Sequence, residues 1–205
     1  MAQSEVDCCN SALARVGAAS IIALDSSTNE GRKCLVAYES NRKSELRKHN
    51  WNFSIKRVTL APDTAAPTFD FTYQFTIPED CLKILRPADY YLDWVIEGRK
   101  ILSNTSNVLN LRYVADVPDV TQWDAVFYDM VSVSLAMDIC EPLTNSVSKK
   151  SALAQDYKDA AAEARKANAF EQGQADPADD GFLVAHRTSG RAGWPANWVN
   201  FKIQA

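Results

Sequence analysis

The feature that most constrains the fold is a change of hydrophobic period at Asn50. Ahead of Asn50, apolar residues recur at the spacing of a helix face, as in the series Val6, Cys9, Leu13 and Val16. After it, Trp51, Phe53 and Ile55 alternate with polar residues, which is the period of a strand. From about residue 117 the helical spacing returns. The pattern therefore predicts a β unit inserted between helices.

Helix-ending and helix-starting residues give approximate bounds for the first two helices. Ser4, with Asp7 three residues later, is an acidic form of the capping box, and Gly17 suits the position after a helix end. The second helix should run from about Glu30 to about Lys48. Its competing N-caps are Ser27, Thr28 and Asn29, its apolar stripe is Leu35, Tyr38 and Leu46 beside Cys34, and its "RK" and "NRK" runs should face solvent.

Two more helices are predicted after the β unit. Asp119 or Thr121 can cap the third, whose apolar circumference indicates a central place in a bundle, and Pro142 should break it. The last helix should run from a cap at Thr144 or Asn145 to about Phe170, with an inward stripe at Leu153, Tyr157, Ala160 or Ala161, and Ala164.

Between the helices, short runs rich in β-branched and aromatic residues predict five or six strands. After the alternating run from Trp51, the candidates are Phe69–Ile77, Leu82–Arg86, Tyr91–Glu97, Lys100–Ser103 and Leu109–Val114. "EGRK" reads as a tight hairpin between two of them.

These elements predict an α+β fold with three parts. Residues 1–50 and 117–172 form a discontinuous helical bundle, residues 51–116 an inserted small antiparallel β domain, and residues 173–205 a linker and extended C-terminal arm. Trp51, Phe53 and Trp123 fall where the period changes, so we expect them to fill the junction between bundle and β domain.

Composition limits the function classes. The formal net charge of −4 and the pI of about 5.2 argue against an electrostatic DNA-binding chain, and residues 117–172 hold nine acidic and five basic side chains. The five cysteines are odd in number and lack paired or zinc-site spacing, so we expect buried, reduced thiols in a protein assembled in a cytosol. No apolar run is long enough for a membrane span, and we expect no membrane insertion.

No motif for chemistry stands out. We find no phosphate-binding glycine loop, GxSxG or HExxH, and His186 has no carboxylate in its segment for a triad. We therefore expect a protein that is not an enzyme and needs no cofactor or metal. The alternative is a small binding or regulatory module that contacts nucleic acid through the basic face of the second helix.

The C-terminal arm is rich in large apolar residues for a tail. It either folds back on its own bundle or joins a neighbouring chain, and we expect donation to a partner because large aromatics anchor interfaces. The interface candidates, for a portal subunit or a neighbouring copy, are Phe182, Trp194, Trp198, Val199, Phe201 and Ile203.

Four segments in order resemble the tail tubular protein A family, the head-to-tail adaptors of tailed bacteriophages. They are "ALARVGAASIIALD", "YESNRKSELRKHNWNFSIKRVTLA", "YQFTIPEDCLKILRP" and "LRYVADVPDVTQWDAVFYDMVSVSLAMDI", and the resemblance covers roughly residues 4–172. The segments are aromatic and apolar rather than catalytic, and it is their order and spacing that make the resemblance specific.

The resemblance implies a structural protein of the virion, located at the portal vertex and made in the host cytoplasm. It implies a homo-oligomeric ring, usually of twelve copies, between the portal protein and the tail nozzle or next tail ring, with double-stranded DNA passing through the lumen. A lumen that DNA slides through should not bind phosphates. The surplus acid of residues 117–172 then suggests that the last helix or its flanks face the channel, with Asp156, Asp159 and Glu163 as candidate wall residues.

Overall fold

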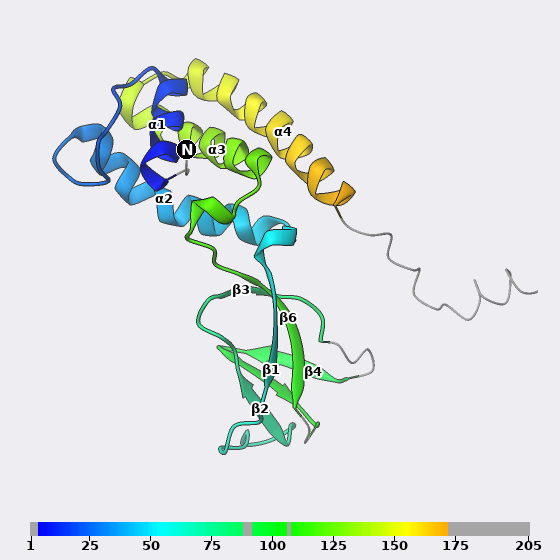
Figure 1. The fold of residues 1–205 in the computed structure, drawn as a ribbon. Helices are drawn as coiled ribbons and strands as arrows, with labels where there is room; N and C mark the ends of the chain where they lie inside the picture. The colour runs from blue at the N-terminus through cyan, green and yellow to red at the C-terminus, as the bar shows by residue number, and fades with distance from the viewer. Residues whose placement is uncertain (1–3, 88–91, 106–107, 172–205) are drawn as a thin grey trace, which may run out of the picture. The chain divides into compact units, whose positions relative to one another are not determined.

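The computed structural model describes residues 4–87, 92–105 and 108–171. These residues form four α-helices and two small antiparallel sheets, so the chain has the mixed α+β fold expected from the sequence (Figure 1). The arm predicted for residues 173–205 lies outside the described residues.

Helix α3 is the centre of the bundle. The helices are α1 (Glu5–Val16), α2 (Asn29–Lys48), α3 (Ala125–Thr144) and α4 (Val147–Phe170). α3 contacts each of the other three, and its buried residues include the run from Met130 to Ala136, which covers every side of the helix. An apolar helix at the centre of a bundle is what the sequence predicts.

Several predicted helix ends are confirmed. Ser4 and Asp7 form a reciprocal capping box, and Gly17 ends α1 in the left-handed region with φ of 78°. Of the three competing caps before α2, Thr28 is the one used: its hydroxyl accepts from the backbone N–H of Gly31 at 3.0 Å. α4 ends at Phe170 as predicted, but its cap is Ser146.

Two predictions about α3 are wrong. Pro142 lies inside the helix, in its last turn, where the Thr144 hydroxyl donates to the Cys140 carbonyl at 2.7 Å and the chain leaves two residues later. Asp119 accepts from the backbone N–H of Thr121 and so caps a separate 3₁₀ turn, η2 (Val120–Gln122), rather than α3.

The buried face of α2 also differs from its prediction. Leu35 is 48% exposed, whereas Arg42 and Glu45 are buried beside Cys34, Tyr38 and Leu46. The helix turns polar residues inward because each of these two charges has partners on other elements, described below. The "NRK" run is therefore not a wholly solvated face.

Six strands make two three-stranded sheets. They are β1 (Ile55–Leu60), β2 (Tyr73–Thr76), β3 (Cys81–Ile84), β4 (Trp94–Glu97), β5 (Lys100–Ser103) and β6 (Leu109–Ala115), in the orders β1-β6-β3 and β2-β5-β4. The predicted "EGRK" hairpin joins β4 to β5, and Gly98 takes the positive φ of 58° that the turn needs.

The start of the β unit is displaced from the predicted position. Residues Asn52–Ser54 form a 3₁₀ turn, η1, and the strand begins only at Ile55. The hydroxyl and backbone N–H of Ser54 both bond to the carbonyl of Trp51, which closes this turn. The run predicted from Phe69 likewise becomes a strand only at Tyr73.

The described residues have two hydrophobic cores. The bundle core combines both halves of the chain, with Leu13 and Leu46 from before the β unit and Phe127, Leu135 and Leu153 from after it. The smaller core lies between the sheets and is formed by Phe75, Ile77, Ile101, Leu109 and Leu111. Contacts of α2 with β3 and β6 join the helical and β regions.

Candidate functional site

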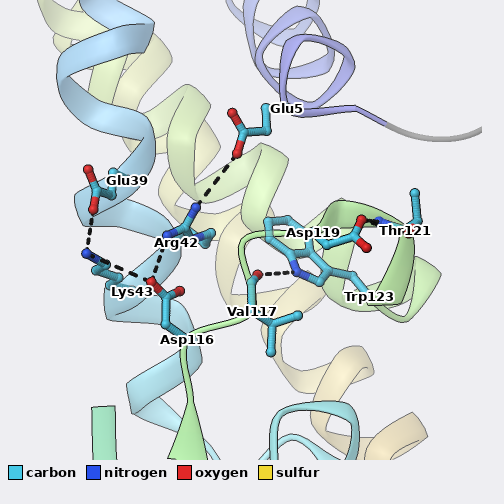
Figure 2. A network of polar contacts seen from close by, with 9 residues as sticks. All are labelled: Glu5, Glu39, Arg42, Lys43, Asp116, Val117, Asp119, Thr121 and Trp123. Atoms are coloured by element: carbon cyan, nitrogen blue, oxygen red, sulfur yellow. Dashed lines mark hydrogen bonds and ion pairs between the residues drawn. The ribbon is translucent and has the colours of Figure 1, made fainter. Parts of the chain in front are cut away.

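Arg42 is the buried centre of an ionic network where the chain returns from the β unit (Figure 2). The residue is only 5% exposed, and its guanidinium donates to Asp116, just after β6, at 2.9 Å. Glu5 of α1 lies 3.8 Å from the same guanidinium, and Lys43 links Asp116 to Glu39. The network therefore ties α1, α2 and the end of the β unit together.

Glu45 forms a second network inside the bundle and is 1% exposed. Its carboxylate accepts from Ser134 of α3 and Lys48 of α2, both at 2.7 Å, and from Tyr157 of α4 at 2.9 Å. Burial opposes the charge of Lys48, but the hydrogen bonds to Glu45 and Tyr157 outweigh it and raise the pKa of Lys48. Three helices thus converge on one carboxylate, whose three bonds offset much of the cost of burying it.

The predicted junction residues surround one phenylalanine. Trp51, Phe53 and Trp123 each make an edge-to-face contact with Phe127 of α3, at centroid distances of 4.9, 4.9 and 5.2 Å. Trp51 lies where the chain leaves the bundle for β1, and Trp123 where it returns from β6. These contacts hold the two crossings beside each other.

The basic face of α2, proposed above as a nucleic-acid surface, is largely occupied. Arg42 and Lys43 pair with carboxylates, Lys48 pairs with Glu45, and Arg47 donates to the backbone carbonyl of Leu82. Of its six basic residues, two, Arg32 and Lys33, have side chains with no ion pair or hydrogen bond among the described residues. Most of the basic side chains of α2 therefore stabilise the fold and are already engaged within the chain, which disfavours their binding to nucleic acid.

A contrasting set of cations lies on the outer face of the sheet β1-β6-β3. Arg57 of β1 and Arg112 of β6 are directly opposite in the register, so their side chains share one face, and both are exposed. Neither side chain has a hydrogen bond or ion pair among the described residues. With Arg86 they line a hollow of about 650 Å³, whose other lining residues are Val58, Thr59, Pro87, Asn110 and Leu111.

The acidic channel candidates form one exposed stripe. Asp156, Asp159 and Glu163 are all exposed, and their spacing of three and four residues puts them on one side of α4. None takes part in an ion pair in the described part of the chain. Their place on a channel wall stays a prediction.

The interface candidates of the arm, from Phe182 to Ile203, lie outside the described residues, so their partner role also stays a prediction. The sequence reading missed the arginine pair. Arg57 and Arg112 are far apart in the chain, and only the strand register of β1 and β6 brings them together.

The cysteines match the expectation of buried thiols. Cys8, Cys9, Cys34 and Cys140 are buried, Cys81 is half-buried, and all five are free. Burial raises the pKa of Cys8 to about 12, which disfavours the reactive thiolate. The described residues contain no group of three or more His, Cys, Asp or Glu side chains placed to hold a metal ion.

What the described arrangement offers, then, is a set of surfaces: an arginine face on one sheet and an acidic stripe on α4.

Within residues 4–87, 92–105 and 108–171 no helix combines the length and apolarity needed to cross a membrane. In comparisons with known proteins, no model of a protein family matches the chain and no curated protein matches it significantly.

Proposed function

We propose that this protein is a head-to-tail adaptor of a tailed bacteriophage, a structural protein that forms a ring between the portal and the tail. Its partners are other copies of itself, the portal protein and the tail nozzle or next tail ring. DNA passes through the ring without sequence-specific binding. The protein acts in the virion, at the neck.

One observation carries the proposal. The bundle core is closed by helices from both ends of the described chain, α1 and α2 with α3 and α4, around an inserted antiparallel β unit. This is the arrangement that the resemblance to the tail tubular protein A family implies. It was also expected from residue periodicity alone, so two separate lines of reasoning support the same architecture.

The polar contacts of α2 favour this structural role over nucleic-acid binding through that helix. A surface that binds phosphates needs cations free to displace counterions. Arg42, Lys43 and Lys48 are instead engaged with carboxylates of the same chain.

The deciding experiment measures the mass of the full-length protein by light scattering, alone and mixed with portal rings of the same virus. We expect the portal peak to gain the mass of a ring of copies, with twelve as the family value. A portal peak of unchanged mass would overturn the proposal. Strong, salt-dependent DNA binding by the isolated chain would support the alternative module instead.

A deletion tests whether the arm anchors the ring. Removing residues 181–205 deletes Trp194, Trp198 and Phe201, and we expect it to abolish attachment to portal-bearing heads. The matched control is Asp179→Asn/Asp180→Asn, which changes the preceding linker and keeps the aromatics. Normal attachment of the deleted protein would show that the arm is not the anchor.

A further inference from the structure

The outer face of the sheet β1-β6-β3 carries cations without a carboxylate. Register places Arg57 opposite Arg112, Thr59 opposite Asn110, and Val114 between Ile55 and Lys83. The only charges among these seven side chains are the two arginines and Lys83, and Lys83 donates to the amide oxygen of Asn50 at 3.0 Å.

The two facing arginines lower the stability of the isolated chain. Like charges directly opposite each other on adjacent strands destabilise the pair. In the neighbouring row the Thr59 hydroxyl donates to the Asn110 side chain at 2.8 Å, and both residues are neutral, so this row offers the arginines no anion. Two exposed guanidiniums beside a hollow of about 650 Å³ form a surface suited to carboxylates supplied by something else.

The same chain carries a surface of the opposite sign. Asp156, Asp159 and Glu163 lie on one exposed side of α4, and the seven-residue span from the first to the third covers about 10 Å of helix. The rows of Arg57 with Arg112 and of Lys83 are two residues apart, or roughly 7 Å along the strands. The two surfaces are thus matched in charge and similar in length.

We propose that the arginine face of one copy binds the acidic stripe of α4 on the next copy. The contact joins two different surfaces and is therefore head-to-tail, the kind that closes into rings when the rotation between copies fits. This inference rests on the proposed ring and specifies what holds neighbours together. It places the three carboxylates at the subunit boundary, in place of the channel wall expected from the sequence.

Charge reversal in the full-length protein tests the contact. The variants are Arg57→Glu/Arg112→Glu, Asp156→Lys/Asp159→Lys/Glu163→Lys, and all five changes together. Assembly on portal rings is followed by light scattering and native mass spectrometry. We expect each partial variant to need at least about tenfold more protein than wild type for half-maximal assembly, and the combined variant to recover most of that loss. Lys158→Glu/Arg165→Glu, on the other side of α4, is the control and should assemble normally.

A disulfide trap gives a readout independent of charge. Under mild oxidation by an added oxidant, Thr59→Cys beside the arginines and Ala152→Cys beside the stripe should form intermolecular disulfides in assembled protein, and Thr59→Cys with Lys158→Cys should not. Circular dichroism confirms that each variant is folded. Partial variants that assemble like wild type, or a combined variant that recovers nothing, would overturn the contact while the adaptor proposal stands. Failure of the wild-type protein to assemble on the portal would instead overturn the adaptor proposal.

Discussion

Arg42 of α2 and Arg57 of β1 are separated by a short stretch of chain, yet their surroundings are opposite. Arg42 is buried, bonded to Asp116 and close to Glu5. Arg57 is exposed, faces Arg112 across the strand pair and has no carboxylate on its row. Arg42 is thus satisfied within its own chain, whereas the facing pair Arg57 and Arg112 is exposed and unpaired.

This difference separates charges that specify the fold from charges available to a partner. A buried carboxylate or guanidinium is tolerable only when other groups of the chain satisfy it, so its neighbours are fixed by folding. An exposed pair of like charges behaves in the opposite way. Its repulsion slightly lowers the stability of the free chain, and binding of an anion relieves that repulsion. The comparison predicts opposite stability effects for mutations in the two regions.

The largest effect should come from Glu45→Ala. The change leaves Ser134, Lys48 and Tyr157 without their shared acceptor, and we expect the free energy of unfolding to fall by about 3 kcal/mol. Urea denaturation measures it. The control is Glu39→Ala on the same helix, whose exposed pair with Lys43 should contribute much less to stability because solvent screens it. Equal losses for the two variants would refute the distinction between internal and surface charges.

Arg42→Met should have the next largest effect. Methionine retains much of the buried volume but removes the guanidinium from Asp116 and Glu5, which leaves Asp116 only the more distant Lys43, at an expected cost of about 2 kcal/mol. Adding Asp116→Ala in the same chain should restore part of the loss, since the unpaired carboxylate is then gone. A double variant that is less stable than either single one would show that Asp116 has stabilising contacts apart from Arg42.

Arg57→Gln/Arg112→Gln should change stability with the opposite sign. Removing the facing charges relieves repulsion, so the free chain should be unchanged or more stable by up to about 1 kcal/mol. The gain should shrink in high salt, because screening already weakens repulsion between exposed charges. A clear loss of stability would mean that these arginines also have a structural role, and the contrast with Arg42 would fail.

Local signals in the sequence were sufficient for much of the fold. Helix caps such as Ser4 and Gly17, the "EGRK" hairpin and the change of period are set by neighbouring residues, so they can be read without tertiary information. Pro142 shows the limit of such rules, because a proline in the last turn costs little when the chain is about to leave the helix.

The candidate surfaces depended on information that one segment does not contain. The inward turn of Arg42 and Glu45 requires Asp116, Ser134 and Tyr157, all distant in sequence. The α4 stripe could be found from helical spacing alone. The arginine pair could not, because a shift of one residue in the register of β1 and β6 would put Arg57 and Arg112 on opposite faces.

The smallest predicted effect concerns pH and lies at the crossing between the two regions. The ring of His49 packs edge-to-face on Trp51 with 4.8 Å between the ring centroids, and it lies near the amide of Asn168. Burial, followed by the nearby cations Arg165 and Lys83, lowers the pKa of His49 from its ordinary 6.5. The unfolded chain therefore binds this proton more tightly than the folded chain does.

The direction of the pH effect on stability follows from this difference in proton affinity between the folded and unfolded chain. The contribution of neutral His49 is complete above pH 6.5, the ordinary value, and is lost as the pH falls from there through the folded-state pKa. Urea denaturation between about pH 7.5 and about pH 5.5 should show declining stability, with a flatter profile for His49→Gln. His186→Gln removes the other histidine and should keep the wild-type slope. A slope that disappears with His186 and persists without His49 would move the pH sensitivity away from the crossing.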